Sequence, residues 1–135
     1  MIRVRDIHEQ GGAREEATSI FFGTYTCEGD VRAVTYEELA GAFAGSTVQI
    51  TCTGGNEVSV LRDGPHPTEL VIERGRRHVC QYDTDYGSIL MGVFGESVDC
   101  DMTGTGGTLS FTYTIDTDGS FVTRNTLQIT VKETF

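Results

Sequence analysis

The sequence is organised around one stretch, Gln81-Tyr82-Asp83-Thr84-Asp85-Tyr86-Gly87-Ser88-Ile89-Leu90-Met91-Gly92-Val93-Phe94. This stretch predicts a strand, a tight turn and a second strand, with Gly87 free to adopt a positive φ in the turn. The outgoing arm, from Ile89 to Phe94, is the most continuous apolar run in the chain. Similar hairpins with weaker patterns precede and follow it, so we expect the whole chain to form hairpins of one sheet.

Apolar and polar residues alternate in short segments on both sides of this hairpin, which is typical of half-buried strands. The segment 17–27 has Gly23 in its middle, which indicates a bend such as a barrel corner. The apolar phase slips between Val4 and Ile7, and a β-bulge would explain the slip. We expect a polar loop over 9–16, and strands over residues 2–8, 17–27, 31–37, 48–52, 58–62, 70–72, 78–84, 89–102, 109–115 and 127–131.

The 135 residues suggest a single domain, 1–135, with nine or ten strands and little or no helix. Only the segment 39–46 could form one helical turn, and its Phe43 could cap one barrel end or fill the rim. Simple hairpin connections favour an up-and-down arrangement, and closure removes exposed strand edges. We therefore predict an all-β fold, an antiparallel meander closed into a lipocalin-like or calycin-like barrel of 8–10 strands.

The charge balance argues against several classes of partner. Ten basic residues against twenty acidic ones give a formal net charge of −10, and Arg74, Arg76 and Arg77 fit a solvated hairpin tip. A surface that tracks phosphates needs clustered basic residues, so nucleic acid and anionic membranes are disfavoured. No apolar run approaches the ~20 residues of a membrane span, and the first residues lack the apolar core of a signal peptide. A cytoplasmic location is expected.

The residues that usually hold metals are scattered. Cys27, Cys52, Cys80 and Cys100 form no C-x-x-C pair, and His8, His66 and His78 lie far apart. We expect reduced free thiols in a chain without an export signal, and no zinc site. The run 116–119 resembles the start of a calcium loop but lacks the closing glutamate, so a hairpin turn is expected there. No cofactor is expected.

Arg62 is the first candidate for a functional residue, because it is in phase with Val58 and Val60 and should point toward the core. A buried arginine must find acceptors. It could anchor an anion or a carboxylate inside the barrel. Alternatively, it could close one barrel end, bonded to backbone carbonyls or Glu37 and stacked on a tyrosine.

A second group of candidates comes from the incoming arm of the central hairpin, where His78, Cys80, Tyr82 and Thr84 share one face. That face could line the barrel or lie outside it, because the opposite face is no more apolar. Four tyrosines could form an aromatic cluster with hydroxyls at the rim, as in core packing: Tyr36, Tyr82, Tyr86 and Tyr113. The candidate ligand-binding set is Tyr36, Glu37, Arg62, His78, Tyr82, Thr84 and Tyr113, with no catalytic residue and no metal ligand.

The order of these motifs resembles the YwiB-like family of uncharacterised bacterial proteins, which have a calycin-like β-barrel. The most specific matching motif is Tyr82-Asp83-Thr84-Asp85-Tyr86-Gly87, followed by Met91. The chain departs from the family over 39–46, where the family has a more polar connection. The resemblance implies the barrel and a bacterial, cytoplasmic setting, but no activity. The other matching pieces are Gly23 with Tyr25, Tyr36-Glu37-Glu38, Leu61-Arg62-Asp63-Gly64, Gly106-Gly107-Thr108-Leu109 with Tyr113, and the segment 125–133.

Three functions remain open. The first is a non-enzymatic binding module that holds a small, partly apolar ligand, for example an acid met by Arg62, in a lumen open at one end. The second is a structural or interaction protein with a filled barrel, acting through its acidic surface or through self-association such as a homodimer. The third, ranked last, is an enzyme, which would need a titratable pair such as His78 with Tyr82 or Glu37.

Overall fold

The computed structural model describes residues 1–38, 45–64, 67–84, 86–117 and 120–132. None of these residues forms a helix, and hence none forms a helix able to span a membrane. The predicted all-β class is therefore confirmed for the described part of the chain. The strands are Ile2–Gln10 (β1), Ala13–Phe21 (β2), Thr24–Glu28 (β3), Val31–Glu37 (β4), Thr47–Thr53 (β5), Glu57–Asp63 (β6), Thr68–Glu73 (β7), Arg77–Thr84 (β8), Gly87–Thr103 (β9), Gly106–Thr117 (β10) and Ser120–Lys132 (β11).

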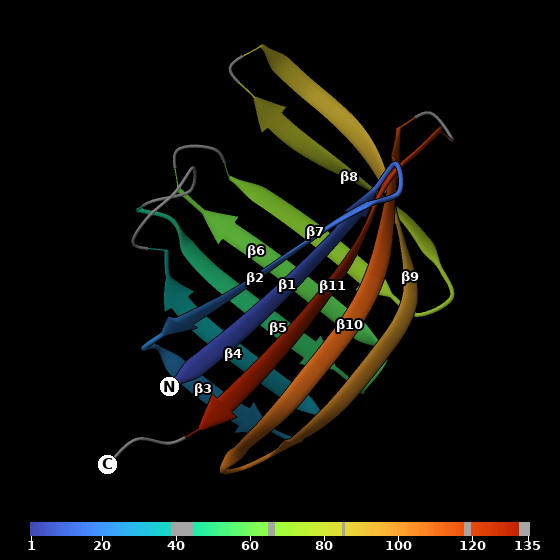
Figure 1. The fold of residues 1–135 in the computed structure, drawn as a ribbon. Coiled ribbons are helices and arrows are strands. Elements are labelled where there is room, and N and C mark those ends of the chain that lie inside the picture. The colour runs from blue at the N-terminus through green and yellow to red at the C-terminus, as the bar shows by residue number, and fades with distance from the viewer. Residues whose placement is uncertain (39–44, 65–66, 85, 118–119, 133–135) are drawn as a thin grey trace.

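The described strands form one antiparallel sheet of eleven strands, in the order β2-β1-β11-β10-β9-β8-β7-β6-β5-β4-β3 (Figure 1). Neighbours in the sheet are also neighbours in the sequence, except that β1 lies beside β11. This pairing runs from Ile2↔Val131 to Glu9↔Arg124. The hairpin meander predicted from the sequence is thus confirmed, with one strand more than the upper limit of the prediction.

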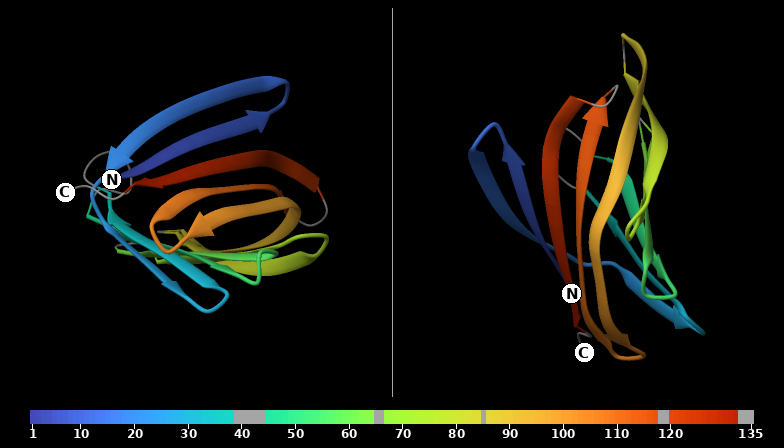
Figure 2. Two further views of the ribbon diagram at one scale, coloured as in Figure 1. Left: turned by 90° about the horizontal axis from the view of Figure 1, so that it is seen from below. Right: turned by 90° about the vertical axis from the view of Figure 1, so that its right-hand side faces the viewer.

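The sheet curls into an open half-barrel, so the closed barrel predicted from the sequence is not what the structure shows. The two edge strands, β2 and β3, are consecutive in the chain and diverge from a shared corner near the N-terminus (Figure 2). The corner is at Gly23, as expected for a glycine inside a long strand. β2 pairs with β1 up to Phe21, and β3 pairs with β4 from Thr24, so the two edges meet only where the chain bends.

Alternation decides which side chains fill the half-barrel. On β10, Leu109, Phe111 and Tyr113 are buried while the residues between them are more exposed. The same rule operates on the opposite wall, where Val48, Ile50 and Cys52 of β5 are buried. The two walls meet in one core cluster, to which β1, β4, β5, β6, β7, β8, β9, β10 and β11 all contribute. Burial of these residues gives the half-barrel an interior filled with side chains over most of its length.

Two local predictions for the N-terminal region are wrong. The pairing of β1 with both β2 and β11 is continuous, so there is no bulge between Val4 and Ile7. Ile7 is buried on the face opposite to Val4, outside the core cluster. Most of the predicted loop over 9–16 belongs to β1 and β2, with only a two-residue turn at Gly11 and Gly12.

The lower end of the half-barrel in Figure 1 is held together by bonds across the interior. The Tyr25 hydroxyl donates to the carbonyl of Thr103 at 2.6 Å, and Arg32 Nε donates to the carbonyl of Met102 at 3.2 Å. Cys52 is buried nearby and contacts Cys100, and burial raises the pKa of the Cys52 thiol to about 11. All four cysteines are free thiols.

The central hairpin forms as predicted, with β8 paired to β9 from Arg77↔Phe94 to Thr84↔Gly87. Gly87 has a φ of 120°, which suits a glycine. β8 is poorly attached on its other side, because its described ladder to β7 consists of the single pair Thr68↔Tyr82. We call this gap in the ladder the β7–β8 seam.

The predicted role of Phe43, in the segment 39–46, lies outside the described residues.

Replacing Gly23 with alanine should destabilise the protein by about 2–3 kcal/mol, because the added methyl group has no room. A Cβ built at Gly23 would lie 2.0 Å from the carbonyl oxygen of Thr35 and 2.8 Å from Ile2 Cδ1. Gly104→Ala is the matched control, since a Cβ there meets nothing within 4 Å. Urea unfolding measures both variants, and equal stabilities would show that the corner does not constrain the sheet.

Candidate ligand-binding site

The inner face of the half-barrel changes from apolar to polar toward its upper end. On β1, Ile2 and Val4 are followed on the same face by Asp6 and His8. On β6, Val58 and Val60 are followed by Arg62, as the phase of the sequence predicted. The upper end therefore brings ionisable side chains from opposite walls onto one inner surface.

Arg62 is held by Glu38, which follows the last residue of β4. The Nε and Nη2 atoms of Arg62 both donate to Glu38 Oε1, at 3.1 and 2.8 Å. Both side chains are mostly buried, with exposed fractions of 25% and 17%. The partner suggested from the sequence, Glu37, is exposed and pairs with Thr47 on the outer face. Because Tyr36 points inward, alternation turns Glu37 outward and brings Glu38 to the interior.

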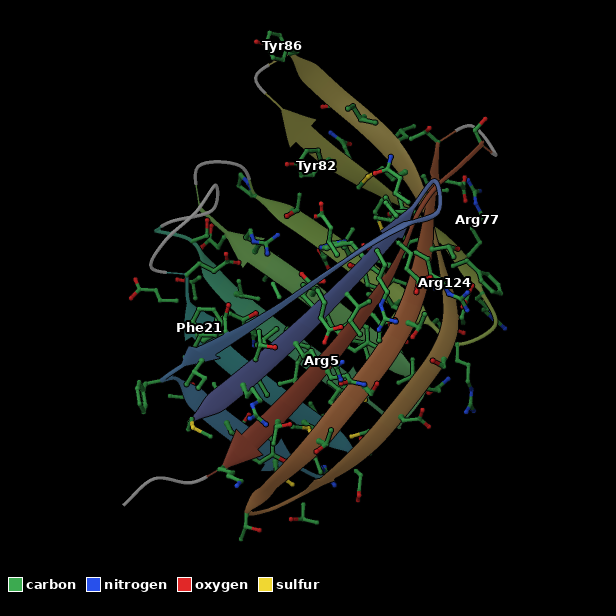
Figure 3. The ribbon with its side chains drawn as sticks, viewed as in Figure 1. Arg5, Phe21, Arg77, Tyr82, Tyr86 and Arg124 are labelled. Carbon is green, nitrogen blue, oxygen red and sulfur yellow. The ribbon has the colours of Figure 1, made fainter. Side chains whose placement is uncertain are left out.

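A pocket of about 200 Å³ lies beside this ion pair. Leu70, Met91 and Ile115 form its apolar wall, and Arg62, Thr68 and Tyr82 supply its polar groups. Tyr82 therefore lies on the inner side of β8, and the same face of β8 also carries the buried Cys80. Figure 3 shows Tyr82 extending from β8 toward the hollow of the half-barrel. The choice between an inner and an outer face for this residue is thus resolved.

The pocket lies at the β7–β8 seam. Thr68 and Tyr82 are the one described residue pair that bridges β7 and β8, and both line the pocket. At the turn between the two strands, Arg76 N–H donates to the carbonyl of Glu73 at 3.1 Å, and Gly75 N–H donates to the carbonyl of Gly95 in β9 at 2.8 Å. The pocket is consequently bordered by the least continuous part of the sheet.

Tyr36 and Tyr113 are both buried next to this ionisable group. Burial raises the pKa of Tyr36 to about 12, with the Glu38 carboxylate adding to the rise. Burial also raises the pKa of Tyr113, on which the charges of Asp6 and Arg62 act in opposite directions. Tyr36 stacks on Phe21 of β2, with ring centroids 4.3 Å apart. Both hydroxyl groups stay protonated at neutral pH and can donate or accept a hydrogen bond.

The aromatic cluster expected from the sequence does not include all four tyrosines. Tyr86 is fully exposed at the tip of the β8–β9 hairpin, far from the core (Figure 3). Tyr113 stacks with Phe111, at a centroid distance of 6.1 Å. Tyr36, Tyr82 and Tyr113 thus belong to the inner surface, and Tyr86 belongs to the protruding hairpin.

Asp6 and His8 form the polar part of β1. Asp6 Oδ1 lies 3.1 Å from His8 Nε2, but it is buried and accepts no hydrogen bond among the described residues. His8 Nδ1 contacts Asn125 Oδ1, and the Asn125 amide donates to Thr123 Oγ1 at 2.9 Å. Burial raises the pKa of Asp6, and the nearby His8 only partly offsets this rise. The interior therefore contains a carboxylate that is incompletely solvated and incompletely paired.

The other two predicted site residues are not brought to the pocket. His78 lies at the opposite end of β8, where its Nε2 is 3.1 Å from Glu73 Oε1. The side chain of Thr84 lies outside the described part of the structure. Strict alternation from Val4 indicates Asp6, and strict alternation from Tyr36 indicates Glu38. The site residues that the sequence does not predict are Asp6, His8, Glu38, Thr68, Leu70, Met91, Ile115 and Asn125.

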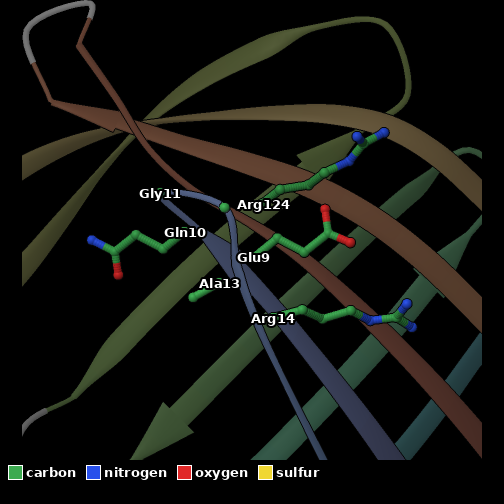
Figure 4. A pocket seen from close by; sticks show the side chains of 7 residues that line it. Glu9, Gln10, Gly11, Ala13, Arg14 and Arg124 are labelled. Atoms are coloured by element: carbon green, nitrogen blue, oxygen red, sulfur yellow. The ribbon is translucent and has the colours of Figure 1, made fainter.

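Two further hollows flank the β1–β2 hairpin. One, of about 370 Å³, lies at its turn (Figure 4). Its arginines already have partners, because Arg14 pairs with Glu16 and Arg124 pairs with Glu96. The other, of about 440 Å³, is bordered by Asp6, His8 and Ala17 together with Glu15 and Glu16. Neither combines polar groups with an apolar wall as the Arg62 pocket does.

Among the described residues, no three His, Cys, Asp or Glu side chains are placed to hold a metal ion.

Comparison with known proteins adds a family and a fold. Residues 2–129 match a family described as a domain of unknown function, DUF1934. No curated protein matches the chain. The crystal structure of the YwiB protein from Bacillus subtilis is similar, with a TM-score of 0.80 and 17% identity over 98% of this chain and 90% of that chain. These findings confirm the resemblance to YwiB-like proteins, and the structural similarity shows a shared fold alone.

Replacing Arg62 with alanine should lower the free energy of unfolding by about 1–2 kcal/mol, because Glu38 is left mostly buried and unpaired. Arg62→Met combined with Glu38→Gln should recover much of this loss, since no unpaired charge then remains. A double-mutant cycle by urea unfolding, using Arg62→Met, Glu38→Gln and the pair, measures the coupling. Strictly additive effects would mean that the ion pair contributes nothing.

Replacing Asp6 with asparagine should raise the melting temperature at pH 7 by a few degrees. The raised pKa means that the folded state holds the Asp6 proton more tightly than the unfolded state. Wild-type stability is therefore complete below the ordinary value of 3.8 and falls as the pH rises through the folded value. The advantage of Asp6→Asn should grow with pH between pH 4 and 7, while the exposed Asp99→Asn serves as control. A constant or reversed difference would contradict this account.

Proposed function

Because the chain belongs to the DUF1934 family, whose description assigns no function, we propose a function from its geometry: it is a non-enzymatic binding module for a small, partly apolar ligand. The observation that carries this proposal is the Arg62 pocket, whose lining residues Leu70 and Ile115 also pack against the core cluster. A filled barrel would leave space for no more than a water or two. The pocket is several times larger than the roughly 30 Å³ that a water molecule occupies.

The lining of the pocket suits a ligand with two chemically different parts. Leu70, Met91 and Ile115 offer apolar surface, and ligand pockets typically combine such a wall with a few placed polar groups. Thr68 and Tyr82 have hydroxyl groups at the same pocket, beside the Arg62–Glu38 pair. In this proposal the half-barrel acts as the ligand-holding barrel of a calycin-like protein, in a bacterial cytoplasm and without a cofactor.

An enzymatic function is less well supported by the arrangement of titratable groups. His78 bonds to Glu73, whereas Tyr82 lines the pocket and Glu37 is exposed on the outer face. The two pairs considered from the sequence are therefore separated. Catalysis by proton transfer requires the acid or base within hydrogen-bonding reach of the reacting group.

A second candidate function is an interaction protein that acts through the β8–β9 hairpin. Val79 and Leu90 of this hairpin are 61% and 63% exposed, and Tyr86 at its tip is fully exposed. Exposed apolar groups gathered on one element can mark a contact surface. In that case the protein acts through association, for example as a homodimer, and the pocket is not used.

Native mass spectrometry of the protein purified from its host tests the binding proposal. The expected result is a reproducible adduct, absent from the denatured mass and lost in Ile115→Phe, because the larger ring fills the pocket. Leu61→Gln is the matched control, since Leu61 is exposed on the outer face of β6. An adduct that survives in Ile115→Phe, or a protein without an adduct and without affinity for small amphiphiles, would favour the interaction protein.

A further inference from the structure

The charges around the pocket restrict the ligand, if the proposed binding function holds. Arg62 is the one cation that lines the pocket, and it is already bonded to Glu38. Asp6 is close enough for its charge to interact with both Arg62 and Glu38. The described groups of this surface thus include two carboxylates against one guanidinium, with the His8 imidazole 3.1 Å from Asp6, in a chain with a formal net charge of −10.

Two carboxylate oxygens at this end have unused capacity to accept hydrogen bonds. Asp6 Oδ1 is buried, and although His8 Nε2 lies 3.1 Å away, this oxygen accepts no hydrogen bond of good geometry among the described residues. Glu38 uses Oε1 for both bonds from Arg62, so that Oε2 accepts none of the bonds found in the described part of the chain. A buried acceptor without a partner costs free energy, and a ligand that donates a hydrogen bond to it removes that cost.

An acid is a poor match for this surface. A carboxylate ligand would compete with Glu38 for Arg62, and it would place a third negative charge beside two others. Like charges at close range disfavour the charged form of each group. An ammonium group presents three donors and no acceptor, and it could bond to a carboxylate and to tyrosine hydroxyl oxygens together.

We therefore propose that the pocket takes a small amine, with its ammonium group toward Glu38 and Asp6 and its apolar tail among Leu70, Met91 and Ile115. The site selects the amine by charge and hydrogen-bond donation, and it selects the tail by burial of apolar surface. A neutral alcohol of the same length is accommodated by the same wall but gains less at the carboxylates. A carboxylic acid of that length is rejected.

Isothermal titration calorimetry with hexylamine, hexanol and hexanoate at pH 7 tests this order with matched tails. Hexylamine is expected to bind at least about tenfold more tightly than hexanoate, which corresponds to about 1.4 kcal/mol. Asp6→Asn and Glu38→Gln should each weaken hexylamine severalfold and leave hexanol nearly unchanged. Ile115→Phe should weaken the binding of both hexylamine and hexanol. This result distinguishes binding in the pocket from unspecific attraction of amines to an acidic protein.

Amide and methyl chemical shifts of the wild-type protein supply a readout that does not depend on any variant. Hexylamine should shift the methyl signals of Leu70, Met91 and Ile115. Hexanoate that binds as tightly as hexylamine, or amine binding unaffected by Asp6→Asn and Glu38→Gln, would overturn the amine proposal and leave the binding function standing. If none of the three compounds binds or shifts these signals, both proposals fail together.

Discussion

The ladder between β1 and β11 is the pairing that turns a row of hairpins into a half-barrel. All other pairings among the described strands join neighbours in the sequence, and each could form without the rest of the chain. The β1–β11 ladder joins eight residue pairs from opposite ends of the chain. It also places Asp6 and His8 on the inner surface shared with Tyr113 and Asn125. The part of the polar end that β1 supplies therefore forms only when the first and last strands are paired.

Burying this polar end costs free energy, and burial of the apolar side chains in the rest of the interior offsets that cost. Buried carboxylates and hydroxyl groups are less favourable than the Val, Ile and Phe side chains that fill the lower part. Departures from consistent core packing are expected at functional sites. The raised pKa values of Asp6, Tyr36 and Tyr113 share one first cause, burial, and all three groups lie beside Arg62. Stability alone provides no reason for such a concentration of polar groups around an unfilled space.

The sequence predicts the strands and the inward direction of Arg62 because both depend on local alternation, which Leu109 to Ile115 and Val58 to Arg62 display clearly. It misleads at Asp6, because the apolar Ile7 beside it suggested a slip in phase, whereas Ile7 is buried on the other face. Glu38 was missed because it follows Glu37 directly and only strict alternation from Tyr36 separates the two. Whether the sheet closes depends on how far β2 and β3 diverge at Gly23, and no local pattern encodes that angle.

The β7–β8 seam has a consequence for how fast the interior can exchange its contents. Separating two fully paired strands requires breaking a whole ladder, which is close to unfolding. Here the described ladder between β7 and β8 is the single pair Thr68↔Tyr82, and both residues line the pocket. The free energy of such a local opening is smaller than the free energy of unfolding the whole protein. If the pocket binds a ligand as proposed, that ligand can enter and leave by local opening at the seam, without unfolding of the whole chain.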